Sequence, residues 1–337
     1  MEQHEVKKYY PHLDLLKGIA ILLMVMGHAI AWSYPDWHFL AGSWQSMSIE
    51  QFNASFVWKV IYSFHMPLLF FVSGFLFYKS DTLTFGKVKV MLNKRIQRLF
   101  IPYITTGFFV FFLKGYFGYW FFIVLFVLNI IVIAELFIES MFKIGTIGEI
   151  CCHSIVFVVL FCAGEVYKDY LPDGLTNLEG LSKYYLYFMF GYHLHKCQKL
   201  ESIVMTNTMM SFSFVFYVIL MVVVTYFGKI KMLGLFIPLF ASSFLYCFAK
   251  KKKDVIGLGG VKMIGKYSME IYVFHLFFVM QIPAVGQYLL SLTNFPTSIT
   301  VQLTYSLLLA FIAIFFSVIM GKIVNSNQYI SKILLGK

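Results

Sequence analysis

Three histidines lie inside long apolar stretches of this 337-residue sequence: His28, His65 and His275. An ionisable side chain is costly in hydrocarbon and rarely persists there without a task. A neutral imidazole, with an ordinary pKa of about 6.5, can accept a proton at physiological pH. These histidines are therefore candidates for acid–base chemistry. The alternative for each is a packed histidine that hydrogen-bonds a neighbouring helix.

His28 shares one predicted helix face with Asp14 and Lys17. The eleven-residue step from Lys17 to His28 returns to within roughly 20° of the same direction, at about 100° per residue. A rise of about 1.5 Å per residue places His28 about 16 Å beyond Lys17. Asp14 and Lys17, three residues apart, can pair. The pattern predicts a catalytic stripe, or else a pair that only anchors the end of the helix.

The other two histidines lie at comparable depths in their own predicted helices. His65 is followed by Ser73-Gly74, which allows close helix approach. Ser268, Tyr272 and His275 share one face of a later helix through their i, i+4, i+7 spacing. Tyr272 and Ser268 could then donate hydrogen bonds. A shared depth is what a common site requires, although depth alone does not show that the histidines meet.

The composition indicates an all-α, polytopic membrane helix bundle. The sequence is 60% hydrophobic and 13% charged, whereas soluble domains carry about 25% charged residues. Repeated apolar runs of about 20 residues are typical of membrane-spanning helices. We expect a single membrane domain over residues 1–337. The net charge of +11 does not indicate nucleic acid, because basic residues in loops explain it better.

Ten spans fit the hydropathy pattern, and the ninth is long enough to tilt or to bend at Pro283. With the N-terminus in the cytoplasm, twenty of the 27 Lys and Arg residues fall inside and six outside, a strong positive-inside bias. Residues 1–12 and 324–337 are then cytoplasmic, and the first span is retained rather than cleaved as a signal peptide. The predicted spans are 13–32, 57–78, 100–114, 118–138, 150–167, 182–196, 208–228, 231–249, 264–290 and 299–323.

The predicted outer loop 33–56 is flanked or occupied by four tryptophans, Trp32, Trp37, Trp44 and Trp58. Tryptophan is enriched at the edges of membranes, so an interfacial belt is the simpler interpretation. A sugar-stacking surface is the alternative.

The five cysteines lie in or beside apolar spans without metal-ligand spacing. We interpret them as helix-packing residues. The sequence therefore leads us to expect no metal site.

Arg95 and Arg98 are one helical turn apart, directly before a predicted span on the cytoplasmic side. Two guanidinium groups at this spacing can clamp phosphates bidentately. The alternative is a positively charged anchor that only sets the topology.

Five stretches together resemble the acyltransferase 3 family of integral membrane acyltransferases. Each is degenerate alone, and their order is more specific. They are Leu13–His28, a basic residue followed after ten residues by His; Phe64–Phe77, FHMPLLFFVSGFLF; Lys94–Tyr103, KRIQRLFIPY; Tyr119–Asn129, YWFFIVLFVLN; and Gly265–His275, GKYSMEIYVFH.

The resemblance implies transfer of an acyl group, usually acetyl, from cytoplasmic acyl-CoA to a hydroxyl of a sugar or surface glycan. It implies that His28 is catalytic and that Arg95 and Arg98 bind the acyl-CoA donor. Lys17 departs from the arginine that many members carry there; it keeps the charge but loses the planar fork. We expect a stand-alone membrane module without the soluble domain of larger members.

The sequence thus predicts a multi-pass O-acyltransferase of the plasma or inner membrane. His28 is the expected base or transient acyl acceptor, with His65, His275, Asp14 and Lys17 as catalytic partners. Trp120 joins Tyr272 and Ser268 as a supporting residue. Acetyl-CoA or another acyl-CoA is a co-substrate, with no tightly bound cofactor. The partners expected are a glycan acceptor and the bilayer, with a homo-oligomer left open. A transporter or flippase is the alternative, although the sequence lacks an inverted repeat.

Overall fold

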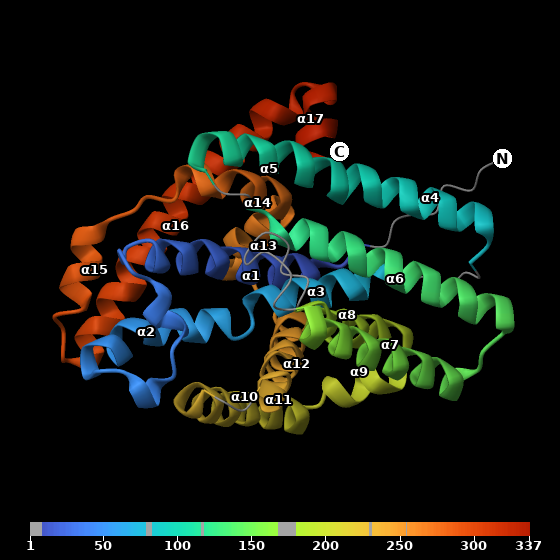
Figure 1. The fold of residues 1–337 in the computed structure, drawn as a ribbon, viewed down its shortest axis with the longest axis horizontal. Coiled ribbons are helices and arrows are strands. Elements are labelled where there is room, and N and C mark those ends of the chain that lie inside the picture. The colour runs from blue at the N-terminus through green and yellow to red at the C-terminus, as the bar shows by residue number, and fades with distance from the viewer. Residues whose placement is uncertain (1–8, 79–82, 116–117, 168–179, 229–230, 254) are drawn as a thin grey trace. The chain divides into compact units, whose positions relative to one another are not determined.

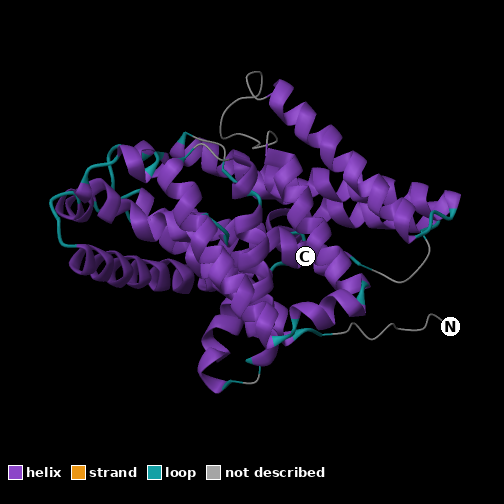
Figure 2. Cartoon of the chain, turned by 90° about the horizontal axis from the view of Figure 1, so that it is seen from below, coloured by secondary structure: helices purple, strands orange, loops and turns teal. Residues whose placement is uncertain are grey.

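The structure, a computed structural model, describes residues 9–78, 83–115, 118–167, 180–228, 231–253 and 255–337. Throughout these residues the elements are helices, joined by loops and turns, with no strand (Figure 2). The all-α membrane fold is therefore confirmed. Lys7 and Lys8, which contribute to the predicted orientation, lie outside the described residues.

All ten predicted spans correspond to helices. Eight helices of the described chain are long and apolar enough to cross a membrane, and a ninth span is counted if one bent pair forms it. The predicted span 182–196 is helix α8, whose 16 residues are too short to be counted. The span predicted at 100–114 is longer than expected, because the helix already begins at Phe85.

The described chain divides into two compact units. The first comprises residues 1–72 and 198–316, and the second comprises 73–197 and 317–337. Helices α3 (His65–Phe77) and α16 (Phe295–Asn325) each run through a point of division.

The first unit is built around α1 (Figure 1). Helix α1 begins with Pro11, whose fixed φ suits the first helical turn. It packs against α2, α12, α13 and α14. The elements of this unit, besides α3 and α16, are α1 (Pro11–Ala31), η1 (His38–Ala41), η2 (Trp44–Ser46), α2 (Ile49–Tyr62), α9 (Gln198–Val204), α10 (Asn207–Phe227), α11 (Lys231–Gly234), α12 (Phe236–Lys251), η5 (Ile256–Leu258), α13 (Gly259–Lys266), α14 (Ser268–Phe278) and α15 (Pro283–Leu289).

Two glycines let α1 and α13 touch backbone to backbone. A Cβ placed on Gly18 would lie 1.9 Å from the carbonyl oxygen of Val261. A Cβ on Gly265 would lie 1.8 Å from the carbonyl oxygen of Asp14. Small residues permit such close crossings in membrane proteins. This crossing fixes the start of α14, and hence the placement of His275, relative to α1.

Of the two possibilities predicted for the long ninth span, a tilt or a bend, the structure has the bend. Helices α14 and α15 meet at a 90° bend, and Pro283 occupies the first turn of α15. After the bend, Gly286 of α15 lies against the backbone of Ser33, where an added Cβ would be 2.1 Å from the Ser33 carbonyl oxygen. The bend therefore lets α14 run beside α1 while α15 packs at the end of α1.

The tryptophan-rich segment after α1 is more ordered than the predicted loop 33–56. Helix α2 begins at Ile49 with a capping box between Ser48 and Gln51. Trp44 is buried, and its Nε1 donates to the hydroxyl of Ser55 over 3.0 Å. Trp37 is 43% exposed. Most of this aromatic surface is thus used for packing, which leaves Trp37 as the tryptophan of the segment that a ligand could reach.

The second unit contains a long helix interrupted by one π-helical turn. Helix α6 runs beside it (Figure 1), and α17 packs on α5. Gly74 of α3 meets α8, since a Cβ there would lie 1.8 Å from the Phe188 carbonyl oxygen. The elements are α4 (Phe85–Arg95), the π-helix η3 (Ile96–Phe100), α5 (Ile101–Lys114), α6 (Trp120–Phe142), α7 (Thr146–Tyr167), α8 (Leu181–Lys196) and α17 (Gln328–Leu335).

Candidate active site

The rings of His28 and His275 stack in the first unit. Their centroids are 5.3 Å apart with an interplanar angle of 26°. The ring of His28 also lies 5.1 Å from that of Trp32, the residue that follows α1. His28 is partly exposed, whereas His275 is buried. Two of the three predicted histidines are therefore direct neighbours, although 247 positions separate them in sequence.

His65 packs on Tyr62, and Tyr62 in turn packs on α1 next to His28. The two rings meet edge to face at 4.8 Å, and Tyr62 also stacks on Trp58 at 4.0 Å. Tyr62 packs on α1 at Gly27, where an added Cβ would lie 2.7 Å from its ring. His65 and His28 interact electrostatically. We call His28, His65 and His275 the histidine cluster.

Backbone carbonyls define the tautomers of the two buried histidines. The Nδ1 atom of His65 lies 2.9 Å from the Ile61 carbonyl oxygen. Nδ1 of His275 lies 3.0 and 2.8 Å from the carbonyl oxygens of Ile271 and Tyr272. Because a carbonyl only accepts, each Nδ1 must carry the proton. In the neutral form, the lone pair of both rings is then on Nε2.

Asp14 and Lys17 pair with each other near the start of α1. Lys17 Nζ lies 2.7 Å from Asp14 Oδ1, and the hydroxyl of Tyr9 donates to Asp14 Oδ2 over 2.8 Å. This hydrogen bond is the main cause that raises the pKa of Tyr9. Three helical turns of α1 separate the pair from His28, a rise of about 16 Å. The pair therefore braces the start of the helix, with no direct contact to the histidine cluster.

The two predicted supporting residues of α14, Tyr272 and Ser268, lie at different distances along the helix from His275. The ring of Tyr272 is buried and lies 6.0 Å from that of His275. Ser268 is the first residue of α14, two turns before His275. Glu270, which also lies on α14, is only 1% exposed. Among these three residues, Tyr272 is the one in ring contact with the histidine cluster.

Arg95, Arg98 and Trp120 belong to the second unit. Arg95 ends α4 with its guanidinium 5.3 Å from the centre of the Phe77 ring. Arg98 is exposed within the π-helical turn, and the two guanidinium groups interact electrostatically. Trp120 packs on Tyr184 at 5.3 Å. The arginine pair thus presents positive charge at a π-turn, a feature frequent at functional sites.

Helix α17 and the glycine that follows it pack against the π-helical turn that carries Arg98. Gly336 follows α17 with φ of +63°, and a Cβ there would lie 2.5 Å from Cα of Arg98. The hydroxyl of Thr105 donates to the Ile333 carbonyl over 2.9 Å. Sequence patterns gave no sign of this contact, because it joins positions more than 200 residues apart.

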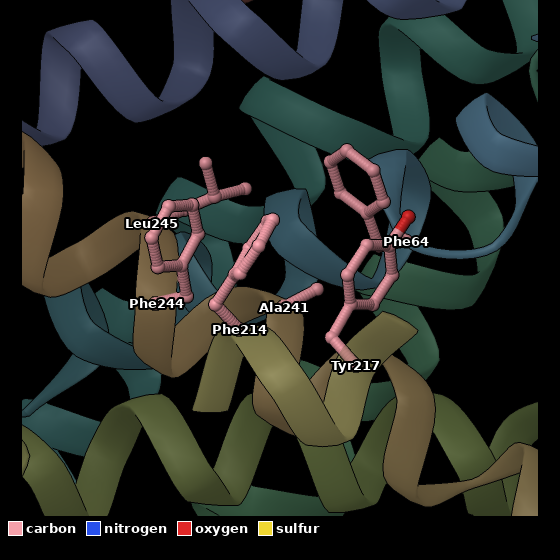
Figure 3. Close-up of a pocket in the computed structure, with 6 residues that line it drawn as sticks. All are labelled: Phe64, Phe214, Tyr217, Ala241, Phe244 and Leu245. Carbon is pink, nitrogen blue, oxygen red and sulfur yellow. The ribbon is translucent and has the colours of Figure 1, made fainter. Parts of the chain in front are cut away.

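An apolar cavity of about 80 Å³ lies elsewhere in the first unit (Figure 3). Its lining contains none of the predicted site residues, and the volume is far below the roughly 300 Å³ at which ligand pockets begin. We therefore regard it as a packing gap rather than a substrate site. It is lined by Phe64, Phe214, Tyr217, Ala241, Phe244 and Leu245.

The arrangement is that of a polytopic membrane protein with a cluster of three imidazoles, two of which are buried. Comparison with known families adds its class: the model of the acyltransferase 3 family, described as an acyltransferase domain, matches residues 10–322. The chain therefore belongs to the acyltransferase 3 family and is a multi-pass membrane acyltransferase. No curated protein and no solved structure matches the chain.

Proposed function

We propose that the protein transfers an acyl group, most simply acetyl, from acyl-CoA to a hydroxyl of a sugar. The acceptor is a surface polysaccharide or lipid-linked glycan, and the membrane is the plasma or inner membrane. The observation that carries this proposal is the stacking of His28 on His275, with His65 packed on Tyr62, which lies against α1, in a chain of this family.

His28 acts as the general base. A sugar hydroxyl is a poor nucleophile at neutral pH, so its proton must be removed as its oxygen attacks. His28 takes this proton while the oxygen bonds to the thioester carbonyl carbon. The carbon–sulfur bond then breaks, and the CoA thiolate takes the proton from His28. His28 suits this role because it is the partly exposed member of the cluster.

His65 and His275 position His28 and adjust its surroundings. Each is held by an Nδ1–H bond to a backbone carbonyl, so its ring cannot turn freely. The ring of His275, stacked on His28, and the ring of Trp32, tilted against it, limit how far the His28 ring can turn. Preorganised groups of this kind lower the cost of reaching the transition state. Asp14 and Lys17 support this arrangement by bracing the start of α1.

Arg95 and Arg98 bind the phosphates of the acyl-CoA donor. Guanidinium groups bind phosphate bidentately and stay charged at any physiological pH. Arg98 is exposed and available, whereas Arg95 is fixed against Phe77. In this proposal acyl-CoA is a co-substrate that binds and leaves in each cycle rather than a resident cofactor.

The test is glycan acylation by variants expressed in a strain that lacks the gene. We expect His28→Ala to abolish the acyl group, identified by mass spectrometry of the surface glycan, while the protein stays folded in the membrane. His38→Ala is the matched control, since His38 is an exposed histidine of the same unit. Near-normal acylation by His28→Ala would reject the role of His28.

Acetyl-CoA binding separates this function from solute transport. Purified protein should bind acetyl-CoA, and Arg98→Ala should bind it more weakly. A transporter of glycans has no reason to bind acyl-CoA, so the absence of binding by the wild-type protein would reject the enzymatic proposal.

A further inference from the structure

A second cluster of ionisable residues is buried in the second unit. Glu135 and Glu139 are one helical turn apart on α6, so they project from the same face. His153 of α7 lies between them. All three residues are more than nine-tenths buried. We call Glu135, Glu139 and His153 the carboxylate cluster; none of them has a part in the proposed acyl transfer.

Hydrogen bonds hold one side of the carboxylate cluster in place. His153 Nδ1 lies 2.6 Å from Glu135 Oε1. The hydroxyl of Tyr185, from α8, lies 2.9 Å from each oxygen of Glu135. The carboxylate of Glu135 therefore fixes the imidazole through Nδ1, which leaves Nε2 as the nitrogen able to coordinate. This is how carboxylates orient metal-binding histidines in known sites.

On the other side of the carboxylate cluster, two buried polar atoms lack hydrogen bonds. Nε2 of His153 and Oε1 of Glu139 face each other over 3.6 Å, and neither atom has a hydrogen-bond partner although both are buried. Leaving such atoms unsatisfied costs about 1–3 kcal/mol each. Two ligand atoms bound about 2.1 Å from one tetrahedral ion lie about 3.4 Å apart. The spacing thus suits two ligands of the same ion.

The charge of the cluster also favours a cation. Two buried carboxylates repel each other and are poorly solvated. Lys196, which interacts electrostatically with Glu139, is already paired with Glu149 over 2.5 Å. One ligand atom from each of Glu135, Glu139 and His153 lies within 4.8 Å of the others, and no other group in the described part of the chain matches this arrangement. A divalent ion would neutralise both carboxylates.

We propose that Glu135, Glu139 and His153 form a binding site for a divalent transition-metal ion of the zinc class. Glu139 and Nε2 of His153 are direct ligands, and Glu135 orients the imidazole. The imidazole distinguishes this class from Mg²⁺ and Ca²⁺, which prefer oxygen ligands alone. The site departs from the metal-free expectation drawn from the sequence.

The ion would join α6 to α7. Helix α7 is largely unburied within the structure, since only 6% of the residues in its most apolar stretch are buried. Its main neighbour is α8 rather than α6. An ion shared by Glu139 and His153 therefore adds a link between two helices that otherwise touch little. Because a ligand that binds only the folded state stabilises it, Zn²⁺ should raise the unfolding temperature of the protein.

The first experiment needs no variant. The full-length protein is purified in detergent, stripped with a chelator, and titrated with Zn²⁺ against a chromophoric zinc indicator. We expect one Zn²⁺ per chain, no displacement by excess Mg²⁺, and a higher unfolding temperature with Zn²⁺. Absence of binding, or displacement of Zn²⁺ by Mg²⁺, would overturn the proposal.

Variants then assign the ligands. Glu139→Gln keeps the shape of the side chain and should weaken Zn²⁺ binding by at least tenfold, and Glu135→Gln by about 10- to 100-fold. Glu149→Gln is the matched control, because Glu149 is a partly exposed glutamate paired with Lys196. Equal affinity of Glu139→Gln and the wild-type protein would overturn the assignment.

Cysteine is the main competitor for zinc. Cys152 interacts electrostatically with Glu135 and Glu139. Cys152→Ser should retain one Zn²⁺ per chain. Loss of zinc from Cys152→Ser together with its retention by Glu139→Gln would place the ion on the thiol and contradict the proposal.

Discussion

The histidine cluster and the carboxylate cluster surround a histidine side chain with different groups. His65 and His275 donate Nδ1–H to backbone carbonyls and lie among aromatic rings. His153 meets the carboxylates of Glu135 and Glu139. A carbonyl acceptor at Nδ1 fixes the tautomer of the ring and leaves Nε2 to exchange a proton, whereas two carboxylates favour a bound cation. The partners of a buried histidine, rather than its depth, thus decide what it can do.

The largest effect expected is on catalysis at His28. Its replacement by alanine should lower acyl transfer by about 10²- to 10⁴-fold, the range for loss of a general base. The same variant should still bind one Zn²⁺ per chain, because the carboxylate cluster is unchanged. The measurements are transfer from labelled acetyl-CoA and zinc titration of one preparation. If His28→Ala lost zinc as well, the two clusters would not be separate sites.

The next effect concerns the close helix crossing in each unit. Gly18→Val should destabilise the α1–α13 crossing by about 1–3 kcal/mol or more, since backbone atoms leave no room for a side chain. Gly74→Val should do the same between α3 and α8. Gly86→Val is the control, because its position is open. Thermal unfolding in detergent measures the loss, and no difference between Gly18→Val and Gly86→Val would contradict the crossing.

A smaller effect is expected at the arginine pair. Arg98→Ala should raise KM for acyl-CoA by about tenfold or more, since a charged hydrogen bond to phosphate contributes about 1.5–3 kcal/mol. Its kcat should change less, because the histidine cluster is intact. Lys94→Ala removes a neighbouring exposed cation and serves as the control. Equal increases in KM for both variants would contradict a specific phosphate contact of Arg98 and would indicate a nonspecific effect of positive charge.

The smallest effect concerns Glu201, outside the spans. Burial raises its pKa, but hydrogen bonds from Lys250 and Tyr246 outweigh this and lower the pKa overall. Its contribution to stability is therefore present above the ordinary glutamate pKa and lost as pH falls through the lowered value. We expect Glu201→Gln to cost about 1 kcal/mol or less at neutral pH. Unfolding temperatures of both proteins should converge in acid; a constant gap would contradict this assignment.

The helical fold could be predicted because each span is a local signal. Apolar runs of sufficient length identified the helices, and Pro283 identified the bend before α15. The start of α4 was missed because Phe85–Arg95 is polar, and only its continuity with the apolar α5 makes one long helix.

The candidate sites were harder to predict. Periodicity placed His28, Asp14 and Lys17 on one face, but it could not show that His275 packs on His28 and that the Asp14–Lys17 pair lies three turns away. The carboxylate cluster was overlooked, although Glu135 and His153 also lie in apolar runs. The sequence identifies both as ionisable residues in apolar runs. Only the structure shows that α6 and α7 bring Glu135, Glu139 and His153 together.

The contact of α17 with the arginine turn has a consequence for how a distant segment could act on Arg98. The family match ends at residue 322, whereas the helix that supports Arg98 begins at Gln328. The backbone of Arg98, the proposed donor-binding arginine, is thus packed against a segment outside the matched range. A substitution in α17 would therefore act on the proposed donor site through its backbone, while every residue of the histidine cluster stays unchanged.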